Sequence, residues 1–302
     1  MTAKRVPRWQ ADLSLALVAL IWGATFVVIK GVLSEVSALY FLTLRFSLAS
    51  ACLLLLFWRP LTGNSRSQVG RGLRGGMIAG VFLWLGYVLQ TFGLKYTTAG
   101  KSGFLTGFYI ALVPLLSAAV YRRWPLLREL AGVAIATAGM VLLTLPGPAS
   151  ALRVNLGDLL TLGCAAAFAI HILILSYYSR QELFQAVAFG QILCAALLSA
   201  LSLAFEPPQI RWSANVLSAL AITAVLATAV AFAVQTWGQK YTSPTRTALI
   251  FSLEPVFALA TAVVVGREPL TTTALLGGGL ILVGILTVEL KPAAAPGRQP
   301  VT

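Results

Sequence analysis

The chain has 302 residues, of which 58% are apolar and only 10% are charged. A soluble domain has about a quarter of its residues charged, so this composition excludes an ordinary water-soluble protein. The net charge of +13 does not indicate nucleic-acid binding, because most basic residues lie in short connections and tails between apolar runs.

Long uncharged runs, such as 13–29 and 102–121, predict an all-α polytopic membrane protein, because about 20 apolar residues of helix cross a bilayer. The first run follows basic residues, as in a signal peptide, but no small-residue cleavage site follows it, so we interpret it as a permanent helix. Ten spans are predicted in chain order, at 13–34, 38–58, 73–94, 98–121, 127–145, 157–178, 184–205, 214–237, 244–265 and 271–290.

The basic residues predict the orientation of these spans. If the N-terminus is cytoplasmic, fifteen of the 22 basic residues fall on the cytoplasmic side and six on the other, while Arg45 lies within a span. Cytoplasmic connections are enriched in Lys and Arg, so both termini are expected in the cytoplasm, with the protein in a cell inner (plasma) membrane. The six on the opposite side are Lys30, Lys95, Lys101, Arg153, Arg211 and Arg267.

The chain also repeats itself. The third span ends in Gln90–Thr97 (QTFGLKYT) and the eighth in Gln235–Thr242 (QTWGQKYT), which agree at six of eight positions. Because five spans is an odd number, a second copy of the repeat enters the membrane from the opposite side. We therefore predict two inverted five-helix halves, at residues 1–150 and 151–302, with a substrate site near the midplane between them.

Three short motifs carry a resemblance to a known family: Leu20–Phe26 (LIWGATF), Leu44–Phe46 (LRF) and Leu253–Phe257 (LEPVF). Over about residues 12–290 the chain resembles the EamA-type members of the drug/metabolite transporter superfamily. The resemblance implies ten spans in two repeats and export or exchange of amino acids, other metabolites or drugs, without naming the substrate.

The two halves differ where the second has its Glu-Pro pair. The first half has Leu112-Val113-Pro114, about one turn out of register, and Tyr109 lies roughly opposite Glu254. A symmetric mechanism with two carboxylates is therefore not expected.

Charged residues within the hydrocarbon are costly and are candidate functional residues. Glu254 precedes Pro255, which removes a backbone donor and frees a carbonyl one turn back. Glu254 is either a site for a substrate amine or a proton, or a carboxylate that holds neighbouring helices together. Arg45 has two interpretations as well: a structural or gating role, which we favour because the resemblance includes it, or direct substrate contact. Lys101 and Arg246 are interpreted as interfacial anchors.

Several uncharged residues are candidates for lining a cavity. Trp84 and Tyr87 share a face of the third span, Gln90 is adjacent, and Gln235 is its equivalent in the eighth span. Such a lining suits an amphipathic organic substrate, although helix packing explains it as well. His171, three residues after Phe168, is more often a hydrogen-bonded packing residue than a proton carrier, and with Phe168 it could form a cavity wall.

The remaining residue types exclude other classes of protein. Cys52, Cys164 and Cys194 have no paired spacing, so neither a metal site nor another cofactor is expected. No nucleotide-binding loop and no nucleophile–base or metal cluster is recognisable, so we predict no enzyme. Gly132, Gly139 and Gly277–Gly279 predict close helix packing, within the chain or in a homodimer.

The sequence therefore predicts a secondary transporter that exports small organic metabolites such as amino acids, or drugs, by alternating access. Whether transport is coupled to protons is left open, and Glu254 is the residue on which such coupling would depend. The alternative is a monomeric facilitator or channel-like permease.

Overall fold

The computed structural model describes residues 7–30, 32, 34–94, 96, 102, 105–122, 124–144, 155–264 and 270–289. The described part is helical, and its β structure is a single isolated bridge between Val36 and Ile210. The all-α prediction is confirmed there. The predicted terminal tails and the basic residues Lys95, Lys101, Arg153 and Arg267 lie outside the described residues, as does the side chain of Lys30.

Within the described residues, the first half of the chain folds into five helices that overlap the predicted spans and one short additional helix, α3. They are α1 (Arg8–Lys30), α2 (Ala38–Leu56), α3 (Trp58–Gly63), α4 (Arg66–Leu94), α6 (Tyr109–Tyr121) and α7 (Leu127–Thr144).

The second half follows the same plan, with one π-helical segment, η2, between α10 and α11. Its elements are α8 (Leu156–Gln181), α9 (Phe184–Ser202), α10 (Ala214–Ala221), η2 (Ile222–Val230), α11 (Ala231–Gln239), α12 (Pro244–Phe251), α13 (Leu253–Val264) and α14 (Thr272–Glu289).

Among the described residues, five helical segments are long and apolar enough to cross a membrane. These are Ala38–Leu56, Arg66–Gly93, Leu156–Gln181, Phe184–Ser202 and Ala214–Gln239. Leu105–Tyr121 and Thr272–Val288 are apolar but shorter. The chain is thus a multi-pass membrane protein, and the number of ten spans remains a prediction.

The structure corrects the predicted connection between the second and third spans. Residues 59–72 were expected to be a polar loop, but α3 fills its first part and α4 already begins at Arg66. The Ser65 hydroxyl accepts a hydrogen bond from the Gln68 amide, at 3.3 Å, and so caps the start of α4. Exposed arginines in this first part of α4 explain why it was not recognised as part of an apolar helix.

Two predicted spans are broken helices, and only the second break lies one turn before a proline. Pro114 lies inside the continuous helix α6, whose preceding break is at Phe108. The break between α12 and α13 is at Ser252, whose hydroxyl donates to the Leu249 carbonyl at 2.6 Å. Pro255 cannot donate a backbone hydrogen bond one turn back, which is compatible with a break at this point. Both broken helices therefore restart just before Tyr109 and Glu254.

Helix contacts repeat between the two halves. Helix α4 of the first half packs on α8 and α9 of the second half. Its equivalent, 145 residues later, is the α10–η2–α11 run. This run packs on α1 through η2 and α11, and on α2 through η2. Similarly, α6 packs on α8, and α13 packs on α1. Each of these contacts becomes another observed contact when the halves are exchanged, as expected if a pseudo-two-fold axis relates them.

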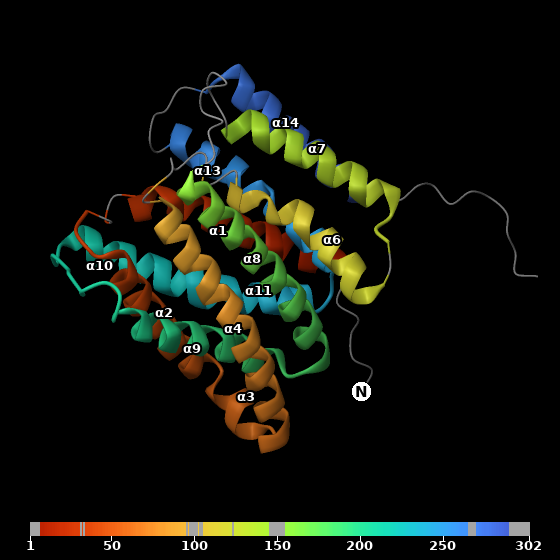
Figure 1. Ribbon diagram of the computed structural model, residues 1–302. Coiled ribbons are helices and arrows are strands. Elements are labelled where there is room, and N and C mark those ends of the chain that lie inside the picture. Colours follow the sequence, from red (N-terminus) through yellow and green to blue (C-terminus); the bar gives the residue numbers. More distant parts are fainter. Residues whose placement is uncertain are drawn as a thin grey trace, which may run out of the picture.

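The helices α7 and α14 form a close pair along one edge of the molecule (Figure 1). A Cβ atom on Gly139 would lie 2.5 Å from the Gly277 carbonyl oxygen, and one on Gly132 would lie 2.6 Å from that of Gly284. Real Cβ atoms do not approach this closely, so only glycine permits the observed distance between the helices. These glycines serve packing within one chain.

Aromatic side chains connect the two largest buried clusters. One cluster contains residues of α1, α6, α8 and α12, and the other contains residues of α2, α4, α9 and α11. Trp22 and Phe168 pack against both. The rings of Trp22 and Phe232 are 5.2 Å apart and those of Tyr87 and Phe168 are 5.6 Å apart, at equivalent positions of the two halves.

Candidate functional site

Arg45 is the centre of a buried polar cluster between α2, α4 and the π-helix. Its side chain is only 3% exposed. Its Nε donates to the Thr228 hydroxyl at 2.7 Å, and its Nη2 lies 3.3 Å from the Tyr87 hydroxyl and 3.4 Å from the Ala227 carbonyl oxygen. The guanidinium also lies 5.2 Å from the centre of the Tyr87 ring. Arg45 therefore does not reach an aqueous surface, and its hydrogen-bond acceptors are all neutral.

The π-helix supplies two of these acceptors. The Thr228 hydroxyl, besides accepting from Arg45, donates to the Thr223 carbonyl five residues back at 2.8 Å. The Ala227 carbonyl also accepts from Trp22 Nε1 on α1, at 2.9 Å. Short π-helical segments inside α-helices often occur at functional sites. Here η2 brings a cation on α2 and an indole on α1 to the same carbonyl group.

Glu254 lies in the first turn of α13, directly after the helix break. This turn is packed tightly on α1, since a Cβ atom on Gly23 would lie 2.6 Å from the Glu254 carbonyl oxygen. The Glu254 carboxylate is partly buried and interacts electrostatically with Tyr87, Tyr109 and Cys164. Among the described residues, no basic side chain forms an ion pair with it. The interpretation of Glu254 as one half of an ion pair between helices therefore has no support in the described part.

The two equivalent glutamines have different surroundings. Gln90 Nε2 donates to the Thr106 hydroxyl at 3.2 Å, and that hydroxyl is 3.9 Å from the Cys164 sulfur. Gln235 is 1% exposed, and its Oε1 is buried with no hydrogen-bond partner in the described part of the chain. The indole Nε1 of Trp84 is likewise buried, with no hydrogen-bond partner in the described part of the chain. A buried polar atom without a partner costs about 1–3 kcal/mol, so these two atoms are candidates for binding a ligand.

His171 belongs to a different cluster, which the sequence did not reveal in full. Its Nε2 is 2.8 Å from Gln191 Oε1, and Gln191 Nε2 donates to the Thr236 hydroxyl at 2.9 Å. All three residues are buried. His171 thus has the surroundings of a hydrogen-bonded packing residue. Gln191 is the equivalent of Arg45 in the second half, a correspondence that alignment of α2 with α9 would have found.

The charged residues near the helix ends also pair within the chain. Arg246, interpreted above as an interfacial anchor, lies 2.8 Å from Asp12, and both side chains are mostly buried. The ion pair joins the start of α12 to α1, and the interpretation of Arg246 as an interfacial anchor stays a prediction.

The bundle is closed differently at its two ends. Where α2 begins, the connection after α1 meets the one after α9 through the Val36–Ile210 bridge. Here the Arg211 amide donates to the Glu35 carbonyl at 2.7 Å, and the Glu206 carboxylate accepts from the Leu39 amide at 2.8 Å.

At the other end of α2, a solvent-exposed ion pair joins the two halves. Arg71 Nε and the Glu182 carboxylate are 3.1 Å apart. A second contact between the halves joins Phe57, which follows α2, to Phe184 at the start of α9, with ring centres 6.0 Å apart. The first closure depends on backbone contacts, whereas this one includes a surface ion pair, which contributes little to stability.

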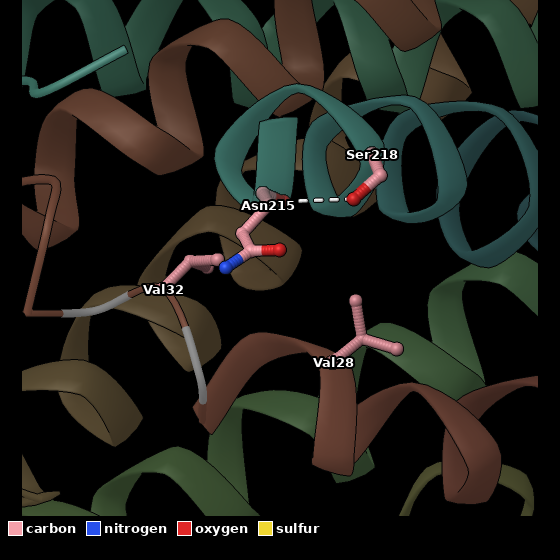
Figure 2. A pocket seen from close by; sticks show the side chains of 4 residues that line it. All are labelled: Val28, Val32, Asn215 and Ser218. Carbon is pink, nitrogen blue, oxygen red and sulfur yellow. Dashed lines mark hydrogen bonds between the residues drawn. The ribbon is translucent and has the colours of Figure 1, made fainter. Parts of the chain in front are cut away.

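Two pockets of the described structure lie near these ends, and no predicted site residue lines them. The first has a volume of about 240 Å³ and lies where α1 ends and α10 begins (Figure 2). Its lining residues are Val28, Val32, Asn215 and Ser218. The second, of about 140 Å³, is lined by Asn64, Gln68, Arg71, Gln181, Glu182 and Leu183. The central candidates are instead packed among the helices.

Comparison with known proteins identifies the family. The profile of the EamA-like transporter family matches residues 9–145 and again residues 155–290. The chain belongs to the EamA-like transporter family. An "Uncharacterized transporter" of Archaeoglobus fulgidus is 38% identical over 289 residues, which cover 96% of this chain and 89% of that protein. The "Uncharacterized transporter YoaV" of Bacillus subtilis is 24% identical, with 90% and 94% covered.

The fold of this EamA-like transporter also matches a known crystal structure. The TM-score is 0.77, at 18% sequence identity, and the match covers 93% of this chain and 97% of the other. The resemblance to the drug/metabolite transporter superfamily is thus confirmed, and the two-repeat plan with it. The chain is a membrane transporter by family.

The structure brings together only some of the predicted site residues of this EamA-like transporter. Arg45 contacts Tyr87, Tyr87 packs on Phe168, and Glu254 interacts with Tyr87 and Tyr109. His171 belongs to the separate cluster with Gln191. Pro114 is buried within α6 and Pro255 lies one residue after Glu254. Their roles remain predictions, as do those of Trp84, Gln90 and Gln235.

Proposed function

We propose that the protein is a secondary transporter of ten spans, built from two inverted five-helix repeats at residues 1–150 and 151–302. It moves small organic solutes, such as amino acids, other metabolites or drugs, outward across the inner (plasma) membrane, with both termini in the cytoplasm. The observation that carries the proposal is the exchange of helix contacts between the halves, in which α4–α8 corresponds to α11–α1. Inverted repeats are a recurring plan of secondary transporters.

The mechanism we propose is alternating access. The central polar groups lie on α2, α4, η2 and the first turn of α13, and each end of the bundle has its own closure, at Val36–Ile210 and at Arg71–Glu182. Opening one closure at a time would expose the centre to one side of the membrane only. A continuous pore would need both to be open together, which is the arrangement expected of a facilitator of channel type.

The first experiment compares metabolites released by cells that produce the wild type, the Glu254→Ala variant or no transporter. Matched protein levels and membrane insertion are the controls. Solutes enriched outside only with the wild type support export and the involvement of Glu254. If the three cultures release the same solutes at the same rates, export is contradicted.

Proton coupling is the finer part of the proposal and depends on Glu254. Glu254 is the one carboxylate among the predicted site residues, so it is the candidate for carrying the proton. We expect the wild-type transport rate to depend on pH and the Glu254→Gln variant to lose that dependence. Transport by reconstituted protein between pH 5 and 8 measures it. A Glu254→Gln variant with the wild-type pH profile contradicts coupling through this residue.

A homodimer is not supported by the glycines that predicted it, since Gly132 and Gly139 contact α14 of the same chain. The oligomeric state therefore has no part in the proposal.

A further inference from the structure

Two residues of opposite charge, Arg45 and Glu254, lie inside the bundle, and within the described part of the chain neither has an oppositely charged side chain as its partner. The acceptors around Arg45 are a threonine hydroxyl, a tyrosine hydroxyl and a backbone carbonyl. Among the described residues, neither Arg45 nor Glu254 takes part in an ion pair. Charges inside a membrane protein normally have an opposite charge beside them or face a pathway for a charged ligand.

The segments that hold these two residues meet at one short stretch of α1. Trp22 Nε1 donates to the Ala227 carbonyl, the same carbonyl that is 3.4 Å from Arg45 Nη2. Gly23, the next residue, lies against the backbone of Glu254. The Trp22–Gly23 pair therefore touches the carbonyl that receives Arg45 on one side and the turn that carries Glu254 on the other.

Tyr87 connects the same two charges from α4. Its hydroxyl lies 3.3 Å from Arg45 Nη2 and also interacts electrostatically with the Glu254 carboxylate. Its ring packs edge-on against Phe168. A cation, an anion and apolar rings are thus arranged around one tyrosine in the region between the halves.

Arg45 retains binding capacity in this arrangement. Its Nε and Nη2 have the acceptors described above, whereas Nη1 donates to no residue in the described part of the chain. A guanidinium binds carboxylates through two parallel donors, which a neutral hydroxyl or carbonyl does not match. A carboxylate on Glu254 is in turn a suitable acceptor for an ammonium group.

We propose, on the basis of the transport function above, that the substrate is a zwitterion that spans these two charges. Its carboxylate binds the Arg45 guanidinium, its ammonium group binds the Glu254 carboxylate, and its apolar part lies against Tyr87 and Phe168. An anion would meet Glu254 as a like charge, and a cation would meet Arg45 in the same way. Either would leave one buried protein charge uncompensated, which disfavours both relative to a zwitterion.

The test uses purified wild type in liposomes loaded with a small-metabolite extract of the producing cells and four added probes. Three of the probes have six carbons and a charged group at each end of the chain. They are the zwitterion 6-aminohexanoate, the dianion adipate and the dication 1,6-diaminohexane. The fourth is 2-aminohexanoate, an isomer of the first with its charges close together. Mass spectrometry follows the release of every solute, with protein-free liposomes as the reference.

We expect the wild type to accelerate the release of at least one of the two aminohexanoates and of neither adipate nor 1,6-diaminohexane. Release confined to anions, cations or neutral solutes overturns the zwitterion and leaves the proposed transport function standing. No accelerated release of any solute, from correctly folded and inserted protein, contradicts the transport function itself.

Variants distinguish recognition of the substrate from a structural role. Arg45→Gln and Glu254→Gln should each slow zwitterion release by about tenfold or more, because each removes one charge-assisted contact. Arg45→Lys keeps the charge and should retain more of that release than Arg45→Gln. Arg59→Gln, at an exposed position of α3, is the matched control and should leave both the rates and the ranking of solutes unchanged.

A purely structural Arg45 gives a different result. Arg45→Gln would then lower the melting temperature and slow all transported solutes equally, with their ranking preserved. That outcome, in protein that remains monodisperse, contradicts the assignment of Arg45 to the anionic group.

Discussion

At the scale of single residues, the two halves have the same framework but different polar groups. Arg45 on α2 corresponds to Gln191 on α9, and Tyr87 on α4 corresponds to Phe232 on α11. In the first half the polar cluster carries a charge, whereas in the second it is an amide with a histidine. Equivalent positions have therefore acquired different chemistry, and the charged one lies next to the π-helix.

Replacing Gln191 by Leu should destabilise the protein by about 1–3 kcal/mol, because His171 and Thr236 would each lose a buried hydrogen-bond partner. Thermal unfolding in detergent measures the change. Gln10→Leu, at an exposed position of α1, is the control and should have little effect. Equal melting temperatures for the two variants would contradict a stabilising role of the Gln191 cluster.

At the scale of helices, glycine determines which helices approach closely. On α4, Gly76 and Gly80 face the backbone of α9, where a Cβ atom would lie 2.3 and 2.5 Å from carbonyl oxygens of Val187 and Gln191. Gly86 faces the Phe168 ring on α8. Such contacts gain packing and weak hydrogen bonds in a medium where the hydrophobic effect does not hold helices together.

For the α7–α14 pair, Gly139→Leu should separate the helices and cost about 1–3 kcal/mol or more, since the side chain would overlap the backbone of Gly277 and Ile281. Gly279→Leu introduces the same side chain on α14 where no atom lies within 4 Å, and should be tolerated. Melting temperature and gel-filtration profile compare the two variants. A tolerated Gly139→Leu would show that α7 and α14 can move apart at little cost.

At the scale of the whole molecule, the closure where α2 begins joins the two halves through backbone hydrogen bonds. The connection after α1 belongs to the first half and the connection after α9 to the second. Alternating access requires the halves to separate here in every cycle. The single bridge between Val36 and Ile210 is the place to test that requirement.

Cysteines at Val36 and Ile210 should form a disulfide, because residues opposite each other in an antiparallel pair have suitable Cα separations, of about 4.5–5.5 Å. We expect oxidation to stop transport by the double variant and reduction to restore it. The single variants Val36→Cys and Ile210→Cys should be unaffected by oxidant. A cross-linked protein that transports at the full rate would exclude opening at this end.

The sequence was sufficient for most of the apolar helices, because apolar runs of membrane length leave few alternatives to a helix, but not for α3 or the polar first turns of α4. The repeated Gln90 and Gln235 motifs likewise predicted the equivalence of α4 with the α10–α11 run. The break at Ser252 lies one turn before Pro255, as a missing backbone donor predicts, whereas Pro114 breaks no helix and the break at Phe108 was not predictable from it. The hydrogen bonds that tie Arg45 to η2 were not predictable, because they need the register between two helices far apart in sequence.

The unequal packing of the two equivalent helices has a mechanical consequence. α4 is a continuous α-helix pressed by its glycines directly onto α8 and α9, so it can shift little without carrying those neighbours along. Its counterpart contains nine residues in π-helical geometry, which is a less favourable and more easily rearranged hydrogen-bond pattern. Two copies of one structural unit therefore differ in stiffness. We therefore expect a change of length or twist to cost least in the copy that contains the π-helix.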